Sequence, residues 1–83
     1  MRYDENWAVE IGRISDYFLQ QPDVVRTEVG FRFGGCQITL EPLPPSGIGS
    51  WTVARTRVRM EGPEEETNAI HSRFFLRFLS AGG

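Results

Sequence analysis

Hydrophobic residues recur every three or four positions in the first part of the chain. The spacing is four, three and four residues for Trp7, Ile11, Ile14 and Phe18. This pattern places the four side chains on one face of an α-helix, and it predicts a helix over Asp4–Gln21. Pro22 follows at once, and a residue before a proline avoids the helical conformation, so we expect the helix to end there.

From Val25 onward the hydrophobic period changes to two. Val25–Phe33 and Cys36–Glu41 both alternate apolar and polar residues, which predicts two half-buried strands. Gly34–Gly35 between them suits a two-residue hairpin turn. Such a turn brings all the apolar side chains onto one face of the hairpin, because it pairs Phe33 with Cys36, Phe31 with Ile38 and Val29 with Leu40.

The second half of the chain predicts a loop, a strand and a helix. Pro42–Gly49 contains three prolines and two glycines, so we expect a loop there. Ser50–Met60 alternates again and predicts a third strand. Pro63 suits the first position of a helix, and apolar residues spaced by three or four follow it: Ile70, Phe74, Phe75, Phe78 and Leu79.

These elements predict an α+β fold with the order helix, strand, strand, strand, helix. A sheet whose strands are joined by short connections is antiparallel, so we expect a three-stranded antiparallel meander in a two-layer sandwich, with both helices on one face. The 83 residues allow one small globular domain, 1–83, in which we expect 80–83 to be a frayed C-terminal tail.

Composition and charge narrow the function classes. All nine basic residues are arginine, and eleven acidic residues give a net charge of −2, so the overall basic excess typical of nucleic-acid binders is missing. No apolar run approaches the roughly 20 residues of a membrane-spanning helix, and the N-terminal residues do not resemble a signal peptide. We therefore expect a cytoplasmic protein without a membrane partner.

The sheet face turned away from the helices is the best candidate for a functional surface. Tryptophan and arginine are frequent at the energetic centres of protein interfaces. We expect this face to carry Trp51, Val53, Arg55, Arg57, Arg59, Arg32, Glu28 and Glu41. Glu28 opposite Glu41 would need a neutralising cation. The pattern predicts a non-enzymatic protein-binding or assembly module, which forms a homodimer or binds an unidentified protein through this face or the edge of the third strand. A solvated face with ordinary ion pairs is the alternative interpretation.

Two further functions stay open at this point. The arginine cluster could bind nucleic acid or another anion, because guanidinium groups bind phosphate in a bidentate manner. The predicted order of elements is similar to that of double-stranded-RNA-binding domains. However, Glu64–Glu66 stands where those domains have a basic helix start, so we do not assign that family. Gly82–Gly83 is similar to the C-terminal glycine pair of ubiquitin-like sulfur carriers, which implies sulfur carriage at the C-terminus.

Catalysis has two candidate side chains, Cys36 and His71, which could form a thiol–imidazole pair. Cys36 lies on the apolar side of the predicted hairpin, where a free cysteine acts as a small hydrophobic residue. His71 lies beside the apolar stripe of the last helix. We therefore expect both to be inert, and we predict no catalytic residue, no metal site and no cofactor.

Overall fold

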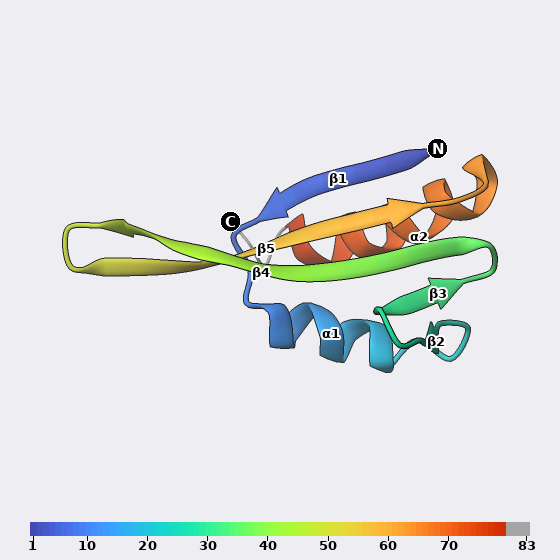
Figure 1. The fold of residues 1–83 in the computed structure, drawn as a ribbon, viewed down its shortest axis with the longest axis horizontal. Coiled ribbons are helices and arrows are strands. Elements are labelled where there is room, and N and C mark those ends of the chain that lie inside the picture. Colours follow the sequence, from blue (N-terminus) through green and yellow to red (C-terminus); the bar gives the residue numbers. More distant parts are fainter. Residues whose placement is uncertain (80–83) are drawn as a thin grey trace.

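The computed structural model describes residues 1–79, with only the backbone of Ile48, so the expected tail at 80–83 lies outside the described residues. Five strands form one antiparallel sheet in the order β1–β5–β4–β3–β2, and two helices accompany it (Figure 1). In chain order the elements are β1 (Arg2–Trp7), α1 (Ile11–Leu19), β2 (Val25–Arg26), β3 (Phe31–Phe33), β4 (Cys36–Ile48), β5 (Trp51–Glu61) and α2 (Glu64–Leu79). The α+β class is confirmed. The expected three-stranded antiparallel meander is present as β3–β4–β5, but β1 and β2 extend it to five strands.

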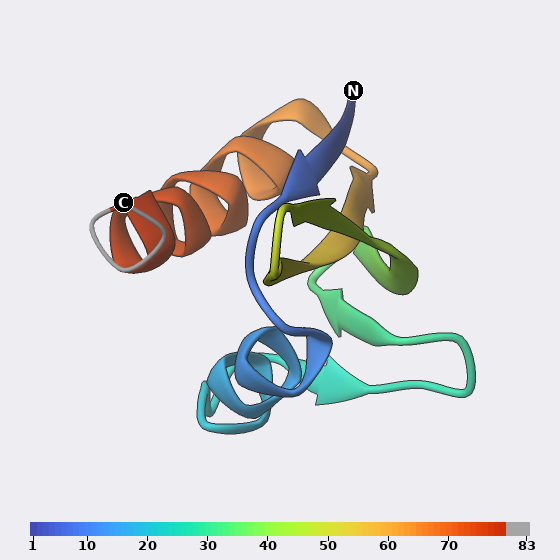
Figure 2. The ribbon, with the colours of Figure 1, turned by 90° about the vertical axis from the view of Figure 1, so that its left-hand side faces the viewer.

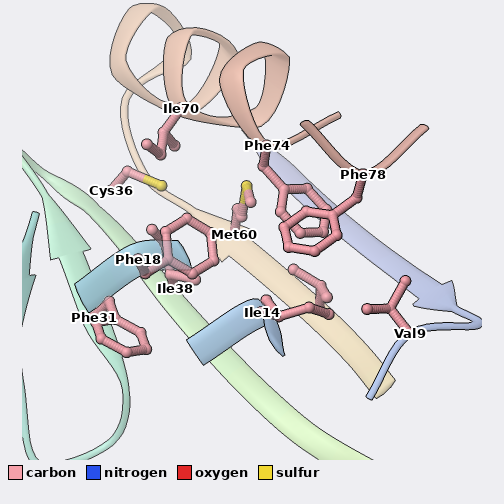
Figure 3. Close-up of a cluster of buried hydrophobic side chains, with 11 residues drawn as sticks. Val9, Ile14, Phe18, Phe31, Cys36, Ile38, Met60, Ile70, Phe74 and Phe78 are labelled. Carbon is pink, nitrogen blue, oxygen red and sulfur yellow. The ribbon is translucent and has the colours of Figure 1, made fainter. Parts of the chain in front are cut away.

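Both helices lie on the same side of the sheet, as Figure 2 shows. Their apolar residues meet the inward residues of β3, β4 and β5 in one cluster (Figure 3). Its buried members are Val9, Ile14, Phe18, Phe31, Cys36, Ile38, Val58, Met60, Ile70, Phe74 and Phe78. The rings of Phe18 and Phe74 stack with their centroids 5.8 Å apart, which joins α1 to α2 above the sheet. No helix among residues 1–79 covers the opposite side of the sheet.

The first strand corrects the prediction of a helix over Asp4–Gln21. Arg2–Trp7 forms β1, which pairs with β5 along its whole length, and α1 begins only at Ile11. The four-residue step from Trp7 to Ile11 resembled a helical spacing. In addition, Glu5 occupies an inward position of β1 and so concealed the two-residue period of this segment.

The hairpin turn at Gly34–Gly35 is confirmed. The residues on either side pair as expected, Phe33 with Cys36 and Phe31 with Ile38. Gly34 has a φ of 57°, in the left-handed region that glycine adopts without steric cost. The Gly35 N–H donates to Oε2 of Glu66 at 2.8 Å, so the turn is attached to the first turn of α2.

The predicted strand Val25–Phe33 is instead a second small hairpin. β2 pairs with β3, and the Thr27 N–H donates to the carbonyl of Gly30 within the connecting turn. Gly30 lies so close to β4 that a Cβ atom there would be 2.2 Å from the carbonyl oxygen of Ile38. This turn takes the chain away from β4, so the expected pairs Val29–Leu40 and Glu28–Glu41 do not form.

The predicted loop Pro42–Gly49 is also wrong, because β4 continues to Ile48 and pairs with β5 on both sides of one irregularity. A bulge between Leu43 and Ser46 accommodates the two adjacent prolines. β3 pairs with β4 only over Cys36–Ile38. Beyond that point one edge of β4 has no neighbouring strand within residues 1–79, and a proline at such an edge removes no hydrogen bond from the sheet.

The last helix, α2, agrees with the predicted pattern except at its edges. Ile70, Phe74 and Phe78 are buried, whereas Phe75 and Leu79 are exposed. Neither α1 nor α2 is long and apolar enough to cross a membrane.

The aromatic cluster between the helices predicts the effect of one core substitution. Phe74 is fully buried and contacts the rings of Trp7, Phe18 and Phe78. We expect Phe74→Ala to lower the free energy of unfolding by about 3–5 kcal/mol, because it removes these contacts and leaves a cavity. The matched control is Leu76→Ala two residues away, which is 73% exposed and should change it by no more than about 0.5 kcal/mol. Urea unfolding measures both, and equal losses would contradict the observed packing.

Candidate functional site

The open face of the sheet, the side away from both helices, carries most of the arginines. Because side chains alternate along each strand and paired residues share a face, its charged members follow from the strand pairing. They are Arg2, Asp4, Arg32, Glu41, Arg55, Arg57, Arg59 and Glu61. Five arginines and three carboxylates give this face a charge of +2, although the whole chain carries −2. The structure therefore separates charge between its two sides.

Arg57 is held by carboxylates on both neighbouring strands. Its Nε and Nη2 atoms donate to the two carboxylate oxygens of Asp4 on β1 at 2.8 and 2.7 Å. Nη1 lies 3.6 Å from Oε2 of Glu41 on β4. The hydrogen bond from Arg57 lowers the pKa of Asp4 below its ordinary value of 3.8. Arg57 thus joins three strands within one chain and has little free capacity for a ligand.

The two arginines on either side of Arg57 differ in their partners. Arg59 Nε lies 3.9 Å from Oδ2 of Asp4, the same carboxylate that binds Arg57. Arg55 donates to the amide oxygen of Asn6 at 3.1 Å and to the hydroxyl of Ser46 at 3.0 Å. Both acceptors of Arg55 are neutral, and no carboxylate within residues 1–79 forms an ion pair with it. Arg55 therefore keeps an uncompensated charge at the end of the arginine row.

A shallow polar hollow of about 430 Å³ lies beside Arg59 on the open face. It is lined by Gly35, Gln37, Thr39, Arg59, Glu61 and Gly62. The two glycines have no side chains, so the hollow is shallow on their side. The other residues offer the guanidinium of Arg59, the carboxylate of Glu61 and the neutral hydrogen-bonding groups of Gln37 and Thr39. This hollow can hold a small polar or anionic group, but it has no apolar wall that would bury a larger ligand.

A two-stranded arm, here defined as residues 43–55 of β4 and β5, projects beyond the rest of the sheet (Figure 1). It extends past the last pair between β1 and β5, which joins Trp7 to Thr56, and it contributes to dimensions of 42 × 25 × 22 Å. Trp51 is 78% exposed at its end and Val53 is 42% exposed. No charged residue occurs between Glu41 and Arg55. Apart from Arg55 at its base, the arm is thus an uncharged ribbon with a tryptophan in solvent.

The structure brings most of the predicted interface residues into one row. Trp51, Val53, Arg55, Arg57 and Arg59 alternate along β5, and Glu41 pairs with Arg57 across β4. Arg32 lies on the same face but on β3, opposite Gln37.

Two sets of predicted residues are not part of this row. Glu28 belongs to the turn between β2 and β3 and does not pair with Glu41, whose strand partner is Arg57. Gly82–Gly83, on which the similarity to sulfur carriers rests, lies outside the described residues.

The sequence did not reveal a polar cluster that attaches β1 to α2. One carboxylate oxygen of Glu5, Oε1, accepts a hydrogen bond from Trp7 Nε1 at 3.0 Å. The same oxygen lies 2.9 Å from His71 Nε2. The ring of Tyr3 stacks on that of His71 at 3.6 Å between centroids, and its hydroxyl donates to Asn68. Only recognition of β1 as a strand, which places Tyr3, Glu5 and Trp7 on its inward side, could have indicated this cluster.

Cys36 and His71 occupy different surroundings. Cys36 is fully buried in the core, and burial raises the pKa of its thiol. A buried thiol with a raised pKa is a poor nucleophile. The ring of His71 instead contacts Glu5, Tyr3 and Phe75. Among the described residues, no three His, Cys, Asp or Glu side chains gather as a metal site would require.

No family model, curated protein or solved structure matches this chain. The arm and the open face therefore carry the functional proposals.

The ion pair between Asp4 and Arg57 predicts a pH effect. The pKa of Asp4 is lower in the folded chain than in the unfolded chain. The pair therefore stabilises the fold above the unfolded pKa of 3.8, and this contribution is lost as the pH falls through the folded value. We expect Arg57→Gln to raise the pKa of Asp4 toward 3.8, as measured by NMR titration of its carboxyl carbon. Arg32→Gln on β3 is the control and should leave it unchanged.

Proposed function

We propose that this chain is a non-enzymatic cytoplasmic assembly module that self-associates through its projecting arm. The observation that carries this proposal is the exposure of Trp51 at the end of an uncharged two-stranded ribbon. An exposed tryptophan offers a large apolar area to a partner. A second copy of the chain supplies the same apolar surface in return, which a homodimer needs.

The hydrogen bonding of the arm supports this proposal. A two-stranded ribbon is only marginally stable in water, and three or more strands are needed for independent stability. The arm of one copy would become part of a larger sheet on pairing with that of another copy. Exposed strand edges are usually protected by charges or prolines. The β5 side of the arm has neither from Trp51 to Ala54, and so it is open to strand addition.

The arginine row would contribute orientation more than affinity. Arg57 already donates two hydrogen bonds to Asp4 within its own chain. Exposed ion pairs contribute about 0–1 kcal/mol each, so the apolar arm supplies the greater part of the binding energy in this proposal.

Anion or nucleic-acid binding is the second candidate, and the charge of +2 on the open face favours it. Arg55 and Arg59 flank the neutralised Arg57. Arg59 has a longer carboxylate contact than Arg57, and the described partners of Arg55 are neutral. Against it, β1, β3 and β4 place no aromatic side chain on the open face for base stacking. We therefore rank it below self-association.

Self-association through the arm is tested by replacing its tryptophan. We expect sedimentation velocity at micromolar concentrations to show a dimer whose dissociation constant rises about tenfold or more in Trp51→Ala, because a large apolar contact is lost. Leu76→Ala is the matched control, since Leu76 is similarly exposed but lies on α2. A wild-type chain that stays monomeric, or a dimer that is indifferent to Trp51→Ala, rules out this function.

Anion binding makes a separate prediction. If the open face binds nucleic acid, electrophoretic mobility shifts should show affinity that falls steeply with salt, because counterions are released from phosphates. Arg55→Gln combined with Arg59→Gln should weaken this binding, whereas Arg13→Gln on α1 should not. Absence of any shift at low salt would exclude the second candidate.

A further inference from the structure

We propose that two copies join edge to edge through β5 of their arms, in an antiparallel register centred on Val53, with Trp51 of each copy opposite Arg55 of the other. This inference rests on the proposed self-association. It adds the register of the two strands and the contact between Trp51 of one copy and Arg55 of the other. It is carried by three independent features: the length of the free edge, the symmetry of an antiparallel pair, and the partners of Arg55.

The free edge of β5 is limited to Trp51–Arg55. β1 occupies the same edge from Thr56 to Glu61. After Trp7 the chain leaves the sheet toward the helices. The Thr56 hydroxyl, which is buried on the helix side of the sheet, donates to the carbonyl of Val9 at 2.7 Å and holds the chain there. No other strand among the described residues follows β1 along this edge. A strand of a second copy could therefore lie in line with β1 and continue the sheet.

Symmetry restricts the register of such a pair. In an antiparallel sheet, residues directly opposite each other point to the same face. Two identical strands related by a twofold axis satisfy this condition only when one residue lies opposite its own copy. A register centred on Val53 pairs the whole free edge and stops before the edge that β1 occupies. A register centred on Thr52 would place no residue of the partner's free edge opposite Arg55. A register centred on Ala54 would place Thr52 opposite Thr56, which already pairs with β1.

The Val53 register also brings complementary side chains together. Trp51, Val53 and Arg55 alternate along β5 and so share one face. In this register Val53 meets its own copy, and each Trp51 ring lies across from a guanidinium group of the partner. Among the described residues, the hydrogen-bond partners of Arg55 are the neutral Asn6 and Ser46, so its charge is free to attract the face of an aromatic ring. The contact between Trp51 and Arg55 therefore occurs twice in the dimer, and the Val53 pair occurs once on the twofold axis.

The register can be tested by disulfide cross-linking. Directly opposite residues of antiparallel strands have Cα atoms about 4.5–5.5 Å apart, which suits a disulfide. We expect Val53→Cys to form a covalent dimer under mild oxidation. Thr52→Cys is the matched control, because Thr52 is also exposed but would lie diagonal to its own copy at about 7–8 Å. The native Cys36 is buried, so the wild-type chain should remain uncross-linked.

The outcomes of this experiment separate the register from the self-association itself. Strong cross-linking of Val53→Cys with little of Thr52→Cys supports the register. Equal or stronger cross-linking of Thr52→Cys overturns it. A chain that is dimeric by light scattering but cross-linked by neither cysteine also overturns the register while leaving self-association in place. A chain that is monomeric in all forms refutes both proposals.

A second pair of variants tests the contact between Trp51 and Arg55. Arg55→Leu removes the guanidinium and should raise the dissociation constant of the dimer about tenfold, because both copies of the contact are lost. Arg32→Leu, on the same face but on β3, should leave the dissociation constant unchanged. Circular dichroism melting checks that both variants fold. An Arg55→Leu dimer as tight as the wild type would exclude the Trp51–Arg55 contact.

Discussion

The double pairing of β5 is the constraint on which the rest of this structure depends. From Thr56 to Glu61 this strand is hydrogen-bonded to β1 on one side and to β4 on the other. Its inward residues, Thr56, Val58 and Met60, are buried beneath the helices, while its outward arginines face solvent. Because a strand alternates its side chains, one element supplies both the floor of the core and the charged row of the open face.

The same strand also explains where the functional surface begins. β1 ends opposite Thr56, whereas β5 and β4 continue beyond it as a ribbon. The helices lie against the main part of the sheet and not against the arm, as Figures 1 and 2 show. The change from a covered sheet to a bare ribbon therefore coincides with the change from charged to uncharged sequence at Arg55.

Sequence reasoning succeeded where the pattern was local. The turn at Gly34–Gly35 and the pairing of its flanking residues depend on neighbours in the chain, so alternation and glycine content were sufficient. It failed at β1, whose partner is far away in the sequence and whose inward Glu5 contacts His71 on α2. It failed again at Pro42–Gly49, because propensity alone does not reveal that an edge of β4 lacks a neighbouring strand. The predicted row of arginines was placed correctly, since β5 keeps its period, but Glu28 was displaced by the unforeseen β2–β3 turn.

The prolines of β4 have a consequence for the size of any assembly. Pro44 and Pro45 lie in the arm and Pro42 lies at its base, all on β4, the strand that would form the other edge. A proline cannot donate the backbone hydrogen bond that an incoming strand requires. Addition of strands would therefore be blocked on one side of the ribbon and permitted on the other. A protein that exposes an apolar ribbon is at risk of forming open-ended fibrils. Here the one-sided blockage would make growth stop once two chains have joined.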